Sequence, residues 1–166
     1  MRYKSCNIFS LLALCLLLMT VGCGYTTGSL HDTQYQTIAV PIFKNQTFYR
    51  GFEHRLTEAV KKEIETKTPY KIVNREEADT LLTGEIVGVQ QPVLTDTALA
   101  TVAEFQLVIT VQIRWKDMKT GKILKDLPVT NRTNVDTRRG QTIETAQEDM
   151  FTHLAELIVE ELEKEW

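Results

Sequence analysis

Segment 105–115 alternates between apolar and polar side chains, and it constrains the fold more than any other part of the sequence. Its apolar positions are Phe105, Leu107, Ile109, Val111, Ile113 and Trp115, and Val108 is the single apolar residue at the alternate positions. Successive side chains of a β-strand point to opposite faces, so the pattern predicts a long strand with one face in the core and one in water. Such strands are typical of antiparallel sheets.

A partner strand and two covering helices are predicted next to this strand. Segment 116–121 is a turn rich in Asp, Lys, Thr and Gly, and segment 122–133 returns as the partner strand, in which Pro128 marks a bulge or an edge. Segments 51–67 and 142–166 carry apolar residues at three- and four-residue spacing, which indicates amphipathic helices. Their apolar stripes are Phe52, Leu56, Ala59, Val60 and Ile64 in the first, and Ile143, Ala146, Met150, Leu154, Leu157, Ile158 and Leu162 in the second.

Three shorter strands complete the predicted order. They are segments 37–43, 70–73 and 81–89, and Pro41 places the first at an edge or ends it. Gly84 and Gly88 should share one face of the third, where they indicate bending or a close backbone approach. The hairpin's apolar face needs a cover. We therefore expect an α+β fold, a two-layer sandwich with two helices packed on one face of a four-stranded, mostly antiparallel sheet.

The N-terminus has the layout of a secretory signal peptide. Arg2 and Lys4 precede segment 8–21, which is apolar except for Ser10 and Thr20 and is short for a membrane span. We therefore expect residues 1–22 to be a cleaved leader; the alternative is an anchor helix that is never cut.

Cys23 is the predicted lipidation site. Segment 20–23 resembles a lipobox, with Gly22 in the usual place and Thr20 where leucine is common. Acyl chains on Cys23 would anchor the protein to a membrane. Gly24 follows, whereas Asp at that place is the common inner-membrane retention signal, so the outer membrane is favoured. We expect residues 23–36 to form the lipidated N-terminus and tether, and residues 37–166 a single α+β domain.

The sequence offers little chemistry for catalysis. The histidines, His31, His54 and His153, lack metal-ligand spacing, and a chain starting at Cys23 has no second cysteine. The acidic segment 74–79 favours a solvated turn over a metal or catalytic cluster. The formal net charge of -3 argues against general nucleic-acid binding. We therefore expect no enzymatic activity, no metal and no cofactor.

Several segments together resemble the LPS-assembly lipoprotein (LptE) family. They are Cys23-Gly24-Tyr25, the stretch 37–47 reading TIAVPIFKNQT, Gly51-Phe52-Glu53 opening a helix, Thr68-Pro69-Tyr70, Ala78-Asp79 followed by Leu82-Thr83-Gly84 and Ile86, and the closing helix over 154–162. The resemblance covers essentially the whole chain after the leader, in order and spacing.

This resemblance implies a non-enzymatic function. Family members sit as a plug inside an outer-membrane β-barrel that delivers lipopolysaccharide to the cell surface, and they are thought to contact lipopolysaccharide through basic residues. Local chemistry offers two candidate patches for its phosphates. One is Lys116, Lys119 and Lys122 at the hairpin tip, and the other is Arg138 and Arg139 before the last helix. The alternative for each is a solvated basic turn.

A second function class stays open. A strand reading Ile-Ala-Val-Pro, followed by an Asn-Gln-Thr loop and a helix, also resembles periplasmic modules of the TolB N-terminal and curli-secretion lipoprotein type. That reading implies an envelope scaffold or secretion channel that assembles into a ring, whereas the plug requires one large barrel partner.

Overall fold

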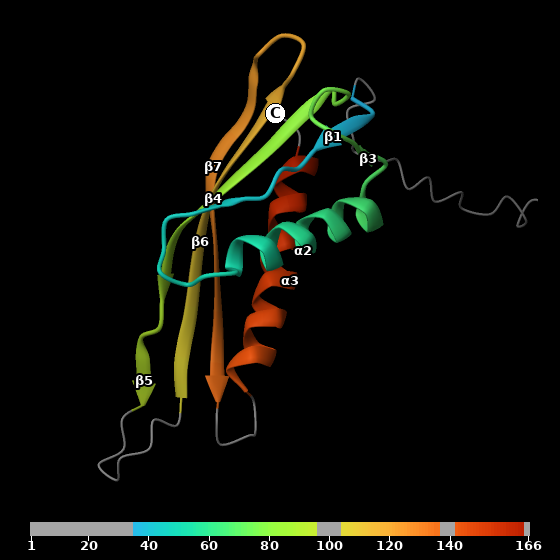
Figure 1. Cartoon of the computed structure of the whole chain (residues 1–166). Coiled ribbons are helices and arrows are strands. Elements are labelled where there is room, and N and C mark those ends of the chain that lie inside the picture. The colour runs from blue at the N-terminus through green and yellow to red at the C-terminus, as the bar shows by residue number, and fades with distance from the viewer. Residues whose placement is uncertain (1–34, 96–103, 137–141, 165–166) are drawn as a thin grey trace, which may run out of the picture.

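The structure, a computed structural model, describes residues 35–95, 104–136 and 142–164. These form two helices and seven strands, shown in Figure 1. In chain order they are β1 (Thr37–Ala39), β2 (Lys44–Asn45), α2 (Phe52–Lys67), β3 (Lys71–Ile72), β4 (Thr80–Gln90), β5 (Val93–Thr95), β6 (Glu104–Asp117), β7 (Ile123–Asp136) and α3 (Ile143–Glu163). Among the described residues, no helix is long and apolar enough to cross a membrane.

The sheet is mixed and seven-stranded, which corrects the expected four-stranded, mostly antiparallel sheet. β6 pairs antiparallel with β4, β5 and β7, and this half matches the expectation. The other half is parallel, because β1 pairs with both β3 and β4, and β2 pairs with β4. β3 falls within the predicted strand 70–73, whereas β2 and β5, of two and three residues, are too short to leave a periodic pattern.

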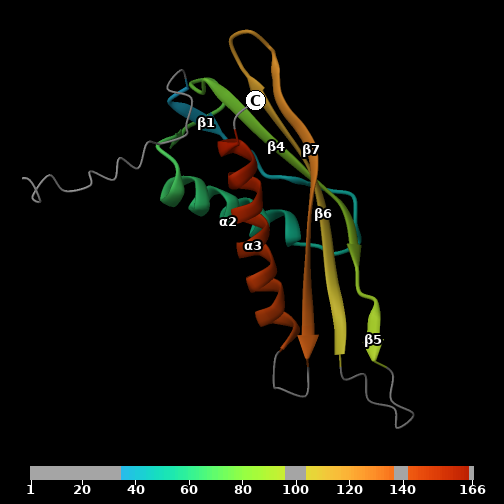
Figure 2. The same cartoon turned by 180° about the vertical axis from the view of Figure 1, so that it is seen from behind.

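Both helices cover one face of this sheet, as expected. In Figures 1 and 2, α2 and α3 lie together on the same side of the strands. α2 follows Gly51, whose φ of 87° lies in the left-handed region, and ends at Lys67, with Thr68 as its C-cap before Pro69. α3 begins after Thr142, whose hydroxyl accepts a hydrogen bond from the Thr145 amide at 3.2 Å.

The alternation in β6 holds in the folded chain. Leu107, Ile109, Val111, Ile113 and Trp115 are at most 2% exposed and belong to the core cluster that both helices join. The outer face of the sheet is polar and is tied by side-chain hydrogen bonds. These bonds join Thr110 to Thr130, Gln112 to Asp126, and Gln106 to Asn134.

The apolar stripe of α3 differs from the predicted one at its start. Ile143 is 45% exposed, because it occupies the first helical turn at the end of the sheet. Phe151, Ala155 and Val159 are buried as well, since α3 packs against both α2 and β7 and therefore buries a wider face.

The sequence predicted that Pro41 either lies in an edge strand or ends the strand, and the structure shows the strand ending before it. β1 stops at Ala39, and β2 resumes pairing with β4 at Lys44. The intervening segment turns Phe43 into the core, where the Phe43 ring is 3% exposed and covers Gly84.

The two glycines of β4 lie on opposite faces, which corrects their predicted arrangement. Gly84 pairs with Ile113 on the core face, whereas Gly88 pairs with Thr110 on the outer face. A bulge between Ile86 and Gly88 shifts the register by one residue, and such a shift moves the following side chains to the other face. A bulge leaves no periodic signal in the sequence.

Candidate functional site: basic residues around the sheet

Of the two predicted basic patches, only the hairpin patch lies within the residues that the structure describes. Lys116, Lys119 and Lys122 lie at the β6–β7 hairpin, whereas Arg138 and Arg139 fall in segment 137–141, outside the described residues. The described part of β7 ends at Asp136, at the end of the sheet away from the hairpin, and α3 begins at Ile143. β7 has 14 residues, so roughly 45 Å of strand separates Asp136 from the hairpin.

Lys119 is held by a carboxylate and is less available than its sequence position indicates. Its Nζ lies 2.7 Å from Asp79 Oδ1. Asp79 Oδ2 accepts from the Gln36 and Thr37 amides at 3.1 and 3.2 Å and from Thr37 Oγ1 at 3.0 Å. The hydrogen bond from Lys119, followed by that from the Gln36 amide, lowers the pKa of Asp79.

These contacts fasten the start of the domain to the hairpin. We call Asp79, Thr37 and Lys119 the clasp. It joins β1, the turn before β4 and the β6–β7 turn, which are far apart in the sequence. Asp79 is thus an exception within segment 74–79, which was expected to be a solvated turn; its side chain is 20% exposed. Among the described residues, no group of acids, histidines or cysteines could hold a metal.

Asp117 organises the hairpin turn itself. Its Oδ1 accepts from the Lys119 amide at 2.7 Å, and its Oδ2 accepts from Thr120 Oγ1 at 2.7 Å and from the Tyr35 hydroxyl at 3.2 Å. The Thr120 hydroxyl is the largest cause of the lowered pKa of Asp117. Gly121 completes the turn with a φ of 74°. These hydrogen bonds hold the backbone of the turn that separates Lys116 from Lys122.

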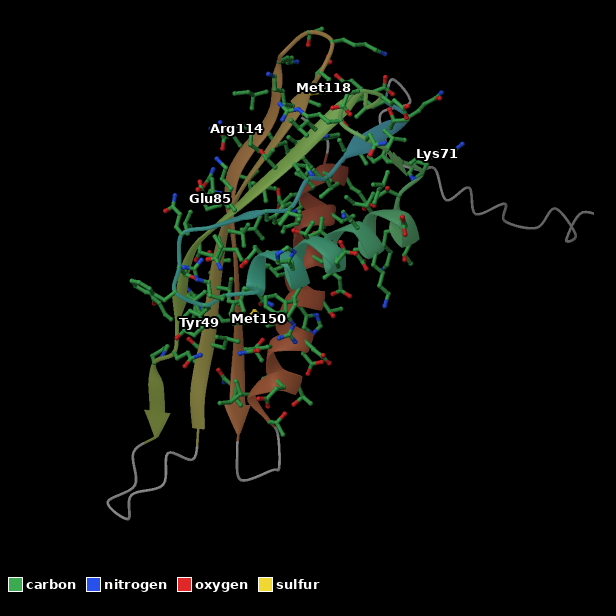
Figure 3. All side chains as sticks on the ribbon, in the orientation of Figure 1. Tyr49, Lys71, Glu85, Arg114, Met118 and Met150 are labelled. Atoms are coloured by element: carbon green, nitrogen blue, oxygen red, sulfur yellow. The ribbon has the colours of Figure 1, made fainter. Side chains whose placement is uncertain are left out.

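A groove on the outer face of the sheet gathers further cations, which the sequence did not bring together. It has a volume of about 430 Å³. Its lining includes the cations of Lys44, Arg75 and Arg114, the carboxylates of Glu85 and Asp126, and the apolar side chains of Pro41, Ile42 and Leu81. Figure 3 shows Glu85 and Arg114 on the side of the sheet away from the helices. We call this the sheet groove.

The cations of the sheet groove differ in their pairing. Arg114 Nη2 lies 2.8 Å from Asp126 Oδ2. The pKa of Asp126 is lowered, first by the hydrogen bond from the Gln112 side-chain amide and then by that from Arg114. Lys44 and Arg75 are exposed and make no hydrogen bond or ion pair with another described side chain. They are 31 positions apart, and the parallel pairing of β2 with β4 brings Lys44 to this face. Of the three cations, the sequence placed only Arg114 on this face, through the alternation in β6.

This arrangement suits binding of an anion. Cations beside apolar side chains can hold a phosphorylated amphiphile by charge-assisted hydrogen bonds and by burial of its apolar part. Within the described part of the chain, the groove offers no nucleophile beside a base.

Comparisons with known proteins agree with the sequence resemblance. The family model described as "LptE: Lipopolysaccharide-assembly" matches residues 35–162. No curated protein matches the chain.

Solved structures share the fold. Lipoprotein B from Nitrosomonas europaea has a TM-score of 0.56 and 17% identity, covering 83% of this chain and 88% of that one. Rare lipoprotein B from Shewanella oneidensis has a TM-score of 0.53 and 17% identity, covering 76% and 93%. The PelC dodecamer subunit from Paraburkholderia phytofirmans has a TM-score of 0.53 and 13% identity, covering 83% and 91%. Identities this low establish the fold alone.

Proposed function

Because the chain belongs to the lipopolysaccharide-assembly (LptE) family, which consists of non-enzymatic envelope lipoproteins, we propose that it is a plug and assembly partner of an outer-membrane β-barrel that exports lipopolysaccharide. The match over residues 35–162 is the observation that carries this proposal. On this proposal the protein is not an enzyme and uses no cofactor. Its domain lies on the periplasmic side of the outer membrane or inside the barrel lumen.

The outer face of the sheet supports a plug role. The lumen of a wide outer-membrane barrel is polar. The face turned away from the helices carries Thr110, Gln112 and Thr130, joined in hydrogen bonds with their neighbours. Such a surface can lie against a polar barrel wall without burying unpaired polar groups.

Lipid on Cys23 would supply the anchor. The described part of the chain begins at Tyr35, whose ring packs edge-on against Trp115 with centroids 6.2 Å apart. Tyr35 lies twelve positions after Cys23, so the anchor can lie at most about 43 Å from this point. The hairpin end of the domain therefore stays within that reach of the anchoring membrane.

Co-purification tests the partner. The tagged full chain, extracted from membranes in mild detergent, should bring down one large β-barrel protein in a 1:1 ratio. The PelC protein shares the fold and forms a dodecamer, and the competing secretion-module proposal likewise predicts a ring of copies of this chain. A ring without a barrel would refute the plug proposal.

Lipopolysaccharide binding tests the basic residues. The chain from Gly24 onward should bind lipopolysaccharide, and added salt should weaken the binding. Each phosphate contact contributes about 1.5–3 kcal/mol, so reversing Arg138 and Arg139 to Glu should weaken binding tenfold or more. The hairpin patch is tested by Lys116→Glu with Lys122→Glu, leaving Lys119 in place because it holds the clasp.

The sheet groove is the third arm of this binding test. Lys44→Glu with Arg75→Glu reverses the two groove cations that form no ion pair with a described side chain, and Lys62→Glu on α2 is the matched control on the helical face. Binding that is unchanged in all three groups of variants would refute recognition through basic residues. The plug role would then rest on co-purification alone.

A further inference from the structure

The loop between β2 and α2 is held in one conformation by Asn45. Its Nδ2 donates to the Tyr49 carbonyl at 2.7 Å and to Glu53 Oε2 at 2.8 Å. Its Oδ1 accepts from the Thr47 amide at 2.8 Å and from Thr47 Oγ1 at 2.7 Å. The hydrogen bond from Asn45 is the largest cause of the lowered pKa of Glu53, so the carboxylate stays charged and holds its place.

This loop presents a phenylalanine to the solvent. Phe48 is 99% exposed, although it stands between residues that the loop fixes. The neighbouring Tyr49 behaves differently, because its ring stacks on Phe52 with centroids 5.3 Å apart. A loop pinned in this way cannot swing Phe48 into the core. Exposing a large aromatic side chain is unfavourable in water, and aromatic side chains are enriched where proteins bind one another.

An open strand edge lies beside the loop. β2 pairs with β4 only as far as Ile86, where the Gln46 amide donates to the Ile86 carbonyl at 3.0 Å. Beyond this point no residue of the described chain pairs with β4 on that side. Val87, at the bulge, is 42% exposed. An apolar side chain thus sits next to an edge whose backbone can accept another strand.

We propose that the β-barrel partner docks on a surface made of Phe48, Val87 and the β4 edge from Val87 to Gln90. We call this surface the Phe48 edge. A segment of the barrel protein would pair its backbone with β4, and an apolar pocket of that protein would receive the Phe48 ring. Strand addition of this kind combines main-chain hydrogen bonds with a side-chain anchor. The inference rests on the proposed function, because that function supplies the barrel.

The surroundings favour a protein over lipid as the occupant. Acyl chains cannot satisfy the backbone groups of an open strand edge, whereas another backbone can. The position points the same way. Figure 3 shows Tyr49 towards the β5 end of the sheet and Met118 at the hairpin end, where Tyr35 joins the domain. The Phe48 edge therefore lies away from the end that is connected to the proposed lipid anchor.

Co-purification of the full chain with point substitutions tests the proposal. Phe48→Ser should lower the amount of co-purified barrel at least tenfold and leave the melting temperature of the isolated domain unchanged, because the side chain makes no core contact. Phe48→Leu should keep most of the barrel. Ile123→Ser is the matched control, since Ile123 is 51% exposed at the hairpin and lies outside the Phe48 edge.

A photo-crosslinking residue at position 48 gives a second readout. It should capture the barrel protein in cells, whereas the same residue at Glu65, on the exposed side of α2, should not. Full retention of the barrel by Phe48→Ser would overturn the proposal. So would equal losses for Phe48→Ser and Ile123→Ser, or crosslinks to lipid in place of the barrel. If the unchanged chain brings down no barrel, the proposed function fails as well.

Discussion

The close contact between Phe43 and Gly84 makes Gly84→Ala the sharpest test of the fold. A Cβ at Gly84 would lie 2.4 Å from Phe43 Cδ2 and 2.5 Å from Phe43 Cε2. Carbon atoms attract best at about 3.5–4.0 Å, so the ring must retreat by roughly 1 Å. The Phe43 ring is buried in the core cluster, where neighbouring side chains oppose such a movement.

The expected cost follows from the balance of two effects. Overpacking a core costs about 1–3 kcal/mol. Replacing glycine stabilises the folded state by about 0.4–1 kcal/mol, since the unfolded chain loses freedom. Gly84→Ala should therefore lower the free energy of unfolding by about 1–2 kcal/mol, equivalent to a fall in melting temperature of roughly 3–10 °C.

Gly88→Ala is the internal control, because its new Cβ would meet only Thr110 Cβ, at 3.9 Å. Urea unfolding of the chain from Gly24 onward, followed by circular dichroism, should show Gly88→Ala unchanged or slightly stabilised. Combining Gly84→Ala with Phe43→Leu should recover part of the loss, and a double-mutant cycle should give a coupling energy of about 1 kcal/mol. Equal stability of the two alanine variants would refute the assigned packing.

The remaining predictions concern the core, the clasp and the anchor. Ile109→Asp should cost several kcal/mol because it buries a carboxylate in the core, whereas Thr110→Asp on the outer face should be mild; equal melting temperatures would mean that the assigned faces are wrong. The folded-state pKa of Asp79 lies below its usual 3.8, so its stabilisation is complete above about pH 4 and is lost as the pH falls towards the folded-state pKa. Urea unfolding between pH 7 and pH 3 should therefore show a larger loss for the unchanged chain than for Asp79→Asn, and parallel curves would contradict this role. Cys23→Ser should abolish labelling by radioactive fatty acid and leave an uncleaved precursor, and continued labelling would exclude Cys23 as the lipid site.

The sequence alone determined the elements whose pattern repeats over many residues. The alternation in 105–115 predicted β6 and its faces, and the spacing in 51–67 predicted α2, because burial of one face imposes a period on a long element. Short capping signals also worked: Thr142 and Pro69 placed the start of α3 and the end of α2. The family resemblance, carried by ordered segments along the chain, is confirmed by the match over residues 35–162.

Only the tertiary structure decided the parallel half of the sheet, the faces of the β4 glycines and the grouping of charged side chains. The two-residue strand β2 carries no period, the pairing direction of β1 and β3 leaves no signal in either segment, and a single bulge reverses every face that follows it. The partner of Lys119 is Asp79, 40 positions away. Lys44 lies in the sheet groove because β2 pairs in parallel with β4. Such contacts depend on the three-dimensional path of the chain, since a charge attracts whichever opposite charge the fold brings within a few ångströms of it.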